Sequence, residues 1–288
     1  LIVVKKQDVI DVIAKQSKIS GEHIKNSSSK FDQFYKRISK EVFGQDENLK
    51  TINDLLSCAK AGLSDEKKPL ASLFFVGPTS VGKTYTAKQI AKHYFGNERA
   101  FVQVNMSELQ DETGISKLIG ASAGYVGFDQ GGFLTNFVRN NPNSVVLFDE
   151  VEKSSPKVLN LLLHLLDEGY LTDNLNRDVD FSKCVVVLTS NIGNEESKKK
   201  SMGFISDDIS EDKSYKDSVK NKLKPELLAR INEVLVFKGL SETDFKNIIR
   251  KEISELCLKL SAKNINLKVS KNCVDHLFKI IKSQKSHA

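Results

Sequence analysis

One stretch limits the fold more than any other. An apolar run, Ser72–Val76, leads directly into Gly-Pro-Thr-Ser-Val-Gly-Lys-Thr at 77–84, and a helical pattern follows to about residue 95. This is the phosphate-binding loop pattern in the strand-to-helix setting that such a loop requires. Backbone N–H groups of the turn and the positive end of the helix cradle phosphate oxygens. We therefore expect residues 77–84 to bind a nucleotide, with Lys83 on the β- and γ-phosphates and Thr84 on Mg²⁺.

A second apolar run supplies two carboxylates. Residues 145–148 (VVLF) end at Asp149 and Glu150, and ligands of open α/β sheets bind at the carboxyl ends of the strands. We expect Asp149 to hold Mg²⁺ through water and Glu150 to polarise the water that attacks the γ-phosphate. Taken alone, such a pair could also start a helix. Its occurrence together with the loop at 77–84 favours the catalytic interpretation.

The order of the patterns predicts an α/β fold. Apolar runs at 72–76, 101–104, 144–148 and 184–189 alternate with helical patterns at about 82–95, 111–120, 132–140 and 156–168. This alternation is typical of a parallel sheet covered by helices on both faces. After a short run at 233–237, Ser241 opens a helix in the S-x-x-D capping pattern, and a second helix follows at 271–283. We expect a linker or the tail of a preceding module over 1–24, a large α/β domain over 25–238 and a small helical domain over 239–288.

The composition argues against several other classes. No apolar stretch approaches the roughly 20 residues of a spanning helix, so no membrane association is expected. The net charge of +6 comes from lysines interspersed with acidic residues, which does not predict a nucleic-acid surface. The four cysteines are widely spaced and are expected to be small buried side chains rather than zinc ligands. The chain begins with Leu1 and has no signal peptide, so we expect a piece of a longer protein.

Further motifs follow one another in a fixed order along the chain. They are VFGQ (42–45), GPTSVGKT (77–84), KLIGA (117–121), GYVG (124–127), VVLFDEVEK (145–153), LLHLLDEGYLTDN (162–174), VVVLTSN (185–191) and KPELLARI (224–231). This order resembles the second AAA+ module of the Clp ATPases over about residues 40–238, and more weakly beyond. Gly-Phe-Asp-Gln-Gly-Gly at 127–132 and Leu-Thr-Asp-Asn at 171–174 look most like the ClpA branch.

The resemblance implies roles for residues that the patterns alone do not assign. Asn191 matches the sensor 1 asparagine that orients the attacking water, although an asparagine can also simply end a strand in a turn. Arg230 matches the arginine finger that reaches a neighbouring subunit's nucleotide, although alone it would be taken for a surface arginine. The preceding Leu227-Leu228-Ala229 departs from the usual aromatic-x-Asn. The implied ATP-binding residues are Val42, Phe43, Gly77, Pro78, Thr79, Ser80, Val81, Gly82, Lys83, Thr84, Tyr85 and Asp149.

Two loops are implied to contact other proteins. Gly124, Tyr125, Val126 and Gly127 match the pore loop whose tyrosine grips an unfolded polypeptide, and residues 169–173 match a second, weaker pore-facing loop. Taken alone, the first would be an aromatic hairpin tip or a tyrosine of the core. Met202, Gly203 and Phe204 match the loop, usually Ile-Gly-Phe, that docks Clp ATPases onto the ClpP peptidase. The alternative is an ordinary loop anchored by one phenylalanine.

The expected function is that of a ClpA-like unfoldase. It would form a homo-hexamer, use ATP and Mg²⁺, and thread substrate proteins, with or without an adaptor, into a ClpP-type peptidase. The expected location is the bacterial cytoplasm or a plastid-type stroma. The alternatives are a ClpB- or ClpC-like chaperone or disaggregase, a nucleic-acid motor and a module that holds ATP without hydrolysing it. Two departures from the family are Ser80, where glycine is common, and the lack of a Gly-Ala-Arg-Pro motif before Ala288.

Overall fold

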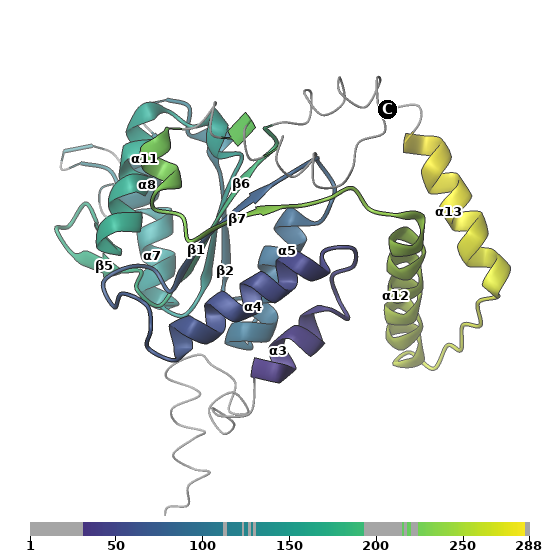
Figure 1. The fold of residues 1–288 in the computed structure, drawn as a ribbon. Coiled ribbons are helices and arrows are strands. Elements are labelled where there is room, and N and C mark those ends of the chain that lie inside the picture. The colour runs from purple at the N-terminus through teal and green to yellow at the C-terminus, as the bar shows by residue number, and fades with distance from the viewer. Residues whose placement is uncertain are drawn as a thin grey trace, which may run out of the picture.

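The computed structural model describes residues 31–111, 114–122, 124–125, 128, 131–192, 215, 218–219 and 224–285. An α/β part is followed by two helices that stand beside it (Figure 1). Val126, Gly127 and the tripeptide Met202–Phe204 lie outside the described residues. The strands are β1 Ala71–Val76, β2 Phe101–Asn105, β3 Val145–Asp149, β4 Tyr170–Thr172, β5 Asp178–Asp180, β6 Val185–Ser190 and β7 Glu233–Val236.

The helices cover both faces of the sheet and form the adjoining part. Short 3-10 turns at Met106–Glu108 and Val151–Lys153 and a π-helical turn at Ala91–Phe95 complete the described elements. None of the described helices is long and apolar enough to cross a membrane. The α-helices are α3 Phe31–Ile38, α4 Asp46–Lys60, α5 Lys83–Ile90, α6 Gly114–Ile119, α7 Phe133–Asn140, α8 Pro156–Glu168, α11 Pro225–Leu228, α12 Glu242–Ser261 and α13 Lys271–Lys285.

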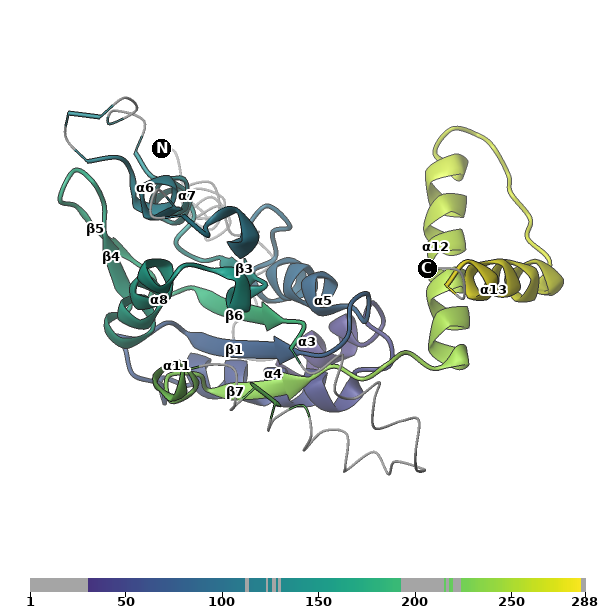
Figure 2. The same ribbon diagram turned by 90° about the horizontal axis from the view of Figure 1, so that it is seen from above.

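Five parallel strands form the main sheet in the order β2-β3-β6-β1-β7 (Figure 2). Every residue of β1 and β6 is buried, as expected for central strands covered on both faces. Side chains alternate between the faces: Phe74 joins a core with α6, α7 and α8, whereas Phe75 joins a core with α3, α4 and α5. Burying each such phenylalanine stabilises the fold by roughly 1.5–3 kcal/mol. The expected α/β class is confirmed.

Two expectations are refined by the structure. Residues 169–173, predicted as a second, weaker pore-facing loop, include strand β4, because Tyr170–Thr172 pairs with β5 in an antiparallel hairpin. That this hairpin faces a pore stays a prediction. The Asp173 carboxylate is buried and accepts hydrogen bonds from the backbone N–H groups of Leu175 and Arg177, which fixes the turn. The cysteines also differ from the expectation. Cys184 is buried, Cys257 and Cys273 are half-buried, and Cys58 is exposed.

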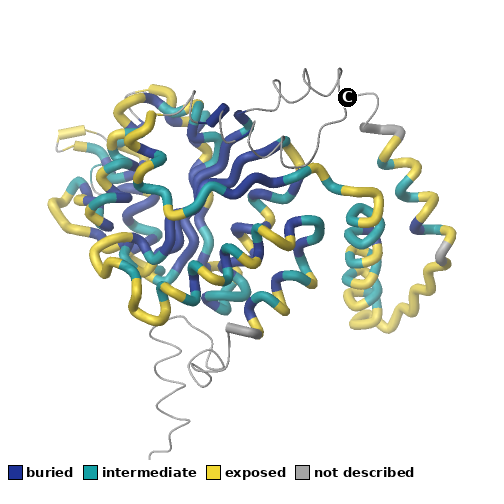
Figure 3. Tube along the Cα trace, viewed as in Figure 1, coloured by how far each residue is buried: buried dark blue, intermediate teal, exposed yellow. Residues whose placement is uncertain are grey.

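The two C-terminal helices are much less buried than the sheet (Figure 3). Helix α12 begins with the expected capping box, in which Ser241 and Asp244 satisfy each other's backbone N–H groups. Ile249 is the buried residue of this helix and Val274 is buried in α13. Little apolar area holds this part together, so we expect its position to depend on polar contacts with the α/β part.

Candidate functional site

The glycine-rich loop joins β1 to α5 and is shaped by unusual backbone angles. Gly77 has φ +146°, and a Cβ there would lie 2.4 Å from the carbonyl oxygen of Phe237. Gly82 has φ +101° and begins α5. Ser80 has φ +63°, in the left-handed region that L-residues other than glycine enter at a cost of about 1–2 kcal/mol. Ser80, which stands where the family commonly has glycine, therefore takes a backbone angle that favours glycine.

Lys83 lies inside this loop and is almost completely buried. Its Nζ donates to the carbonyls of Gly77 at 2.6 Å and Pro78 at 2.7 Å, and to Asn191 Oδ1 at 2.8 Å. Burial lowers the pKa of Lys83 to about 8, although the nearby carboxylates, Asp149 first, act in the opposite direction. An ammonium group held by neutral carbonyls can exchange one of them for a phosphate oxygen, which is a stronger, charge-assisted partner.

Asp149 ends β3 and is fixed by the strands on either side. Its Oδ1 accepts from the hydroxyl of Thr189 on β6, and its Oδ2 accepts from Gln103 Nε2 on β2 at 2.9 Å. Both partners are uncharged. Within the described part of the chain the Asp149 carboxylate therefore has no ion-pair partner.

Glu150 comes next and has φ +60°, which turns its side chain out of the strand. Asn191 Nδ2 donates to Glu150 Oε1 at 2.8 Å, and Lys153 Nζ donates to Oε2 at 2.7 Å. Because the same asparagine accepts from Lys83, three of the predicted site residues form one hydrogen-bonded chain. They come from the ends of β1, β3 and β6, which are neighbours in the sheet.

One carboxylate in this group was missed by the sequence reasoning. Glu152 Oε1 accepts from the backbone N–H of Asn191 at 3.1 Å. Its Oε2 is buried without a hydrogen-bond partner among the described residues. Glu152 lies two positions after Glu150 on a 3-10 turn, and the spacing of a single pair of carboxylates gave no reason to include a third.

A small, mostly apolar pocket of about 170 Å³ continues from the loop. Val42, Phe43 and Tyr85, which the family resemblance assigns to the nucleotide, line it together with residues of the loop. Its far wall comes from the helical part and was not anticipated from the sequence. The lining residues are Glu41, Val42, Phe43, Ser80, Val81, Gly82, Tyr85, Leu240, Ile248, Lys251 and Glu252.

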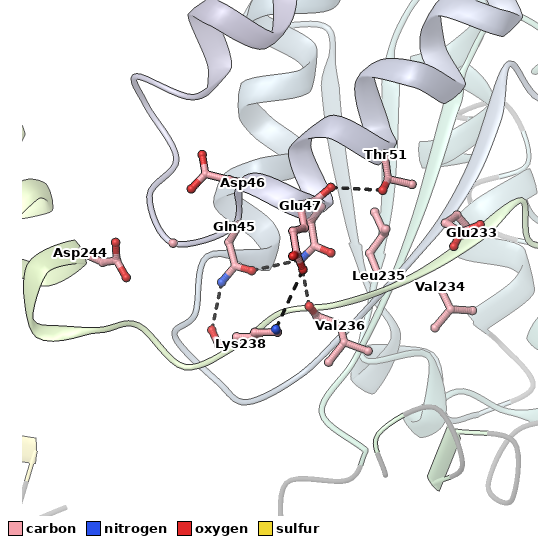
Figure 4. A pocket seen from close by; sticks show the side chains of 12 residues that line it. Gln45, Asp46, Glu47, Thr51, Glu233, Val234, Leu235, Val236, Lys238 and Asp244 are labelled. Atoms are coloured by element: carbon pink, nitrogen blue, oxygen red, sulfur yellow. Dashed lines mark hydrogen bonds and ion pairs between the residues drawn. The ribbon is translucent and has the colours of Figure 1, made fainter. Parts of the chain in front are cut away.

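A larger hollow of about 480 Å³ lies elsewhere, between the start of α4 and β7 (Figure 4). Gln45 Nε2 donates to the Lys238 carbonyl at 3.0 Å, and Asn48 Nδ2 donates to the Val236 carbonyl at 2.9 Å. Strand β7 is at the edge of the sheet, so these amides occupy carbonyls that could otherwise pair with another strand. The residues that line the hollow cover the β7 edge of the sheet. None of them belongs to the phosphate-binding loop.

Arg230 lies at the opposite end of the sheet from the loop. It precedes β7, and its backbone carbonyl accepts from Ser72 at the start of β1. Its Nε lies 2.6 Å from Asp167 Oδ2 on α8, and its Nη1 donates to the Glu226 carbonyl. A six-residue strand is about 20 Å long, so the structure does not bring Arg230 to the Lys83 group of the same chain.

Tyr125 is 73% exposed, between α6 and α7. The turn of the β4–β5 hairpin supports this region, because Asn174 Nδ2 donates to the carbonyls of Ala121 at 3.1 Å and Phe128 at 2.7 Å. Gly120 packs against the same asparagine, which leaves no room for a Cβ. The turn of the β4–β5 hairpin therefore supports the Tyr125 loop.

Comparison with known proteins gives consistent matches. The profile of the AAA domain (Cdc48 subfamily) matches residues 68–234. Chaperone protein ClpB of Prochlorococcus marinus is 36% identical over 278 residues, which are 94% of this chain and 32% of that protein. The ATP-dependent Clp protease ATP-binding subunit ClpC of Staphylococcus aureus is 37% identical over 279 residues, 94% of this chain and 34% of that protein. The chain thus spans about a third of the length of these relatives.

A solved structure agrees with these matches. The closed state of Hsp104 with ATPγS and FITC-casein, determined by cryo-electron microscopy, superposes with a TM-score of 0.81 at 32% identity. The match covers 96% of this chain and 48% of that one. The likeness therefore includes the helical part as well as the sheet.

Proposed function

Because the chain belongs to the AAA domain (Cdc48 subfamily) family and is an AAA+ ATPase module of the Clp ATPase family, we propose that it drives protein unfolding by hydrolysing ATP. The observation that carries this proposal is the hydrogen-bonded chain from Lys83 through Asn191 to Glu150. It joins a phosphate-binding cation to a general base at the carboxyl ends of three adjacent strands. Phosphoryl transfer requires little beyond such positioning and charge neutralisation.

In this mechanism each residue has one task. Lys83 binds the β- and γ-phosphates, Glu150 polarises the attacking water, and Asn191 orients it through its amide. Asp149 and the hydroxyl of Thr84 are oxygen ligands of the kind that Mg²⁺ prefers. The fit is supported by the Asp149 carboxylate, whose two hydrogen-bond partners, Gln103 and Thr189, are both uncharged. Bound Mg²⁺ would neutralise charge that develops on the phosphates.

Arg230 would complete the site of another subunit. It lies about one strand length from its own loop, so it can stabilise a transferring phosphate only across an interface. An arginine in this role is worth about 10³–10⁵ in rate. We therefore propose a ring of identical subunits, and a hexamer in keeping with the family.

The exposed Tyr125 would grip the substrate polypeptide in the channel of that ring. Two functions are compatible with such a ring. One is threading into a ClpP-type peptidase through Met202, Gly203 and Phe204, and the other is a peptidase-independent chaperone. The matched relatives carry both kinds of name at similar identity, 37% for ClpC and 36% for ClpB. The apolar tripeptide in a polar segment favours the peptidase partner, and a ClpA-like assignment rests on it.

Degradation of FITC-casein by the full-length protein with a ClpP-type peptidase tests this choice. We expect ATP-dependent release of fluorescent peptides, its loss with Glu150→Gln or Tyr125→Ala, and its loss with Phe204→Ala while ATP turnover continues. If ATP is hydrolysed but casein is not degraded, and no peptidase co-sediments with the protein, the result would instead favour the peptidase-independent chaperone function. Hydrolysis stimulated by DNA or RNA in a salt-dependent way would favour a nucleic-acid motor.

A further inference from the structure

A single lysine of α12 contacts both segments that border the pocket beside the phosphate-binding loop. Lys251 Nζ pairs with the Glu41 carboxylate and donates a hydrogen bond to the Tyr85 hydroxyl oxygen, and Glu255 Oε1 lies 3.6 Å away. The Tyr85 hydroxyl also lies 3.4 Å from Glu41 Oε2. The three side chains therefore form one closed polar cluster, which joins the helical part to the α/β part.

The two charged members of the cluster are partly shielded from water, whereas Tyr85 is 37% exposed. The side chain of Lys251 is 15% exposed and that of Glu41 is 22% exposed. Burial works against the charge of Lys251, but its bonds to Glu41 and Tyr85 hold its pKa above the ordinary value. Burial raises the pKa of Glu41, but the hydrogen bond and the charge of Lys251, together with the charges of Lys92 and His93, lower it by more. Partly buried ion pairs are screened less by salt than exposed ones.

The position of each member ties the cluster to the pocket. Glu41 directly precedes Val42 and Phe43, and Tyr85 directly follows Thr84 at the start of α5. Lys251 stands on α12 one turn after Ile248, and all of these except Thr84 line the pocket. The pocket continues from the loop expected to hold the phosphates, so it is where the nucleoside of a bound nucleotide would extend.

We propose that the Glu41–Lys251–Tyr85 cluster closes this pocket over the nucleoside, and that Lys251 is a positioning residue which sets nucleotide affinity. The proposal rests on the nucleotide binding proposed above and goes beyond the phosphate contacts. With the cluster intact, Leu240 and Ile248 are held against the pocket and slow the release of nucleotide. Without it, little apolar area keeps α12 in place, because Ile249 is the buried residue of that helix.

Lys246 provides a matched control on the same helix. Its Nζ lies 3.0 Å from Glu242 Oε1 and 3.0 Å from Asp275 Oδ1, so it joins α12 to itself and to α13. It makes a comparable number of ionic contacts but does not line the pocket. Replacing it removes the same charge from the same helix without opening the pocket.

The test is the affinity of the 288-residue chain for a fluorescent ADP analogue (MANT-ADP), measured by titration and by displacement kinetics. We expect Lys251→Met to weaken binding about tenfold, mostly through faster release, and Lys246→Met to leave it unchanged. Glu41→Gln should weaken binding similarly, and the double variant should be no worse than either single one, because both remove the same contact. The exchanged pair, Glu41→Lys with Lys251→Glu, should recover most of the affinity.

Several outcomes would overturn the proposal. Unchanged affinity in Lys251→Met, while Lys83→Gln fails to bind, would show that nucleotide binds without the cluster. A lower melting temperature with unchanged affinity and release rate would assign the cluster a purely structural role. Additive losses in the double variant would mean that Glu41 and Lys251 act separately. Absence of binding by the unaltered chain would contradict the proposed function itself, and is distinguishable from all of these.

Discussion

At the residue scale, Asn191 is central to the site because it is bonded at once to Lys83, Glu150 and Glu152. We predict that Asn191→Ala lowers ATP turnover at least about 100-fold, the lower range for loss of a positioned proton-transfer group. Nucleotide affinity should change only a few-fold, because the loop and Lys83 remain. Turnover and MANT-ADP binding measured on the same preparation check this. Asn140→Ala, at an exposed position at the end of α7, is the control.

Ser80 gives a prediction about stability. Its φ of +63° is costly for serine and cost-free for glycine. Ser80→Gly should therefore raise the free energy of unfolding by about 0.5–1 kcal/mol, since relief of strain exceeds the added chain entropy. The comparison is Ser154→Gly, where φ is −77° and no strain is relieved, so the added chain entropy and the loss of the hydroxyl's hydrogen bond to the Val151 carbonyl both lower stability. Urea unfolding of both variants decides, and a loss of stability in both would refute strain at position 80.

The sequence could predict the residues whose chemistry is carried by a short motif, such as Lys83, Asp149 and Glu150. It could not predict Lys251. That side chain contributes through a contact with Glu41, 210 positions earlier, and nothing in the amphipathic pattern of α12 distinguishes it from the other lysines. Contacts of this kind depend on how two parts pack.

At the element scale, the edge strand β7 is held by an exchange of hydrogen bonds with β1. Asn232 Oδ1 accepts from the backbone N–H of Ser72 at 2.6 Å and from its hydroxyl at 2.8 Å. We predict that Asn232→Ala destabilises the chain by about 1–3 kcal/mol, because a buried N–H loses its acceptor. ATP turnover should fall as well, since the Ser72 hydroxyl also fixes the carbonyl of Arg230.

Chemical denaturation checks the first effect, and Asn247→Ala on α12 provides the comparison because its bond to Arg250 is local. Equal stability of the two variants would contradict the role given to Asn232. The central strands were predictable because runs buried on both faces are continuously apolar. The β4–β5 hairpin was not, because its strands have three residues each and alternate exposed with buried positions.

At the scale of the whole molecule, the residues of the proposed catalytic site lie at two opposite ends of the sheet. The carboxyl ends of β1, β3 and β6 carry Lys83, Glu150 and Asn191, and the opposite end of the sheet carries Arg230. Their separation by about the length of a strand is fixed by the parallel topology. It predicts that ATP turnover per subunit rises with protein concentration, because a site becomes complete only where two subunits meet.

The most direct test of this central claim is a mixing experiment with Arg230→Ala and Glu150→Gln subunits, each fully folded and each measured for ATP turnover alone and at equal proportions. We predict that each variant alone is nearly inactive. The mixture should regain about a quarter of the unaltered rate, the share of interfaces that pair an intact Glu150 with an intact Arg230 in a randomly mixed ring. A mixture as inactive as its components, although both variants bind nucleotide and assemble with each other, would contradict a shared site.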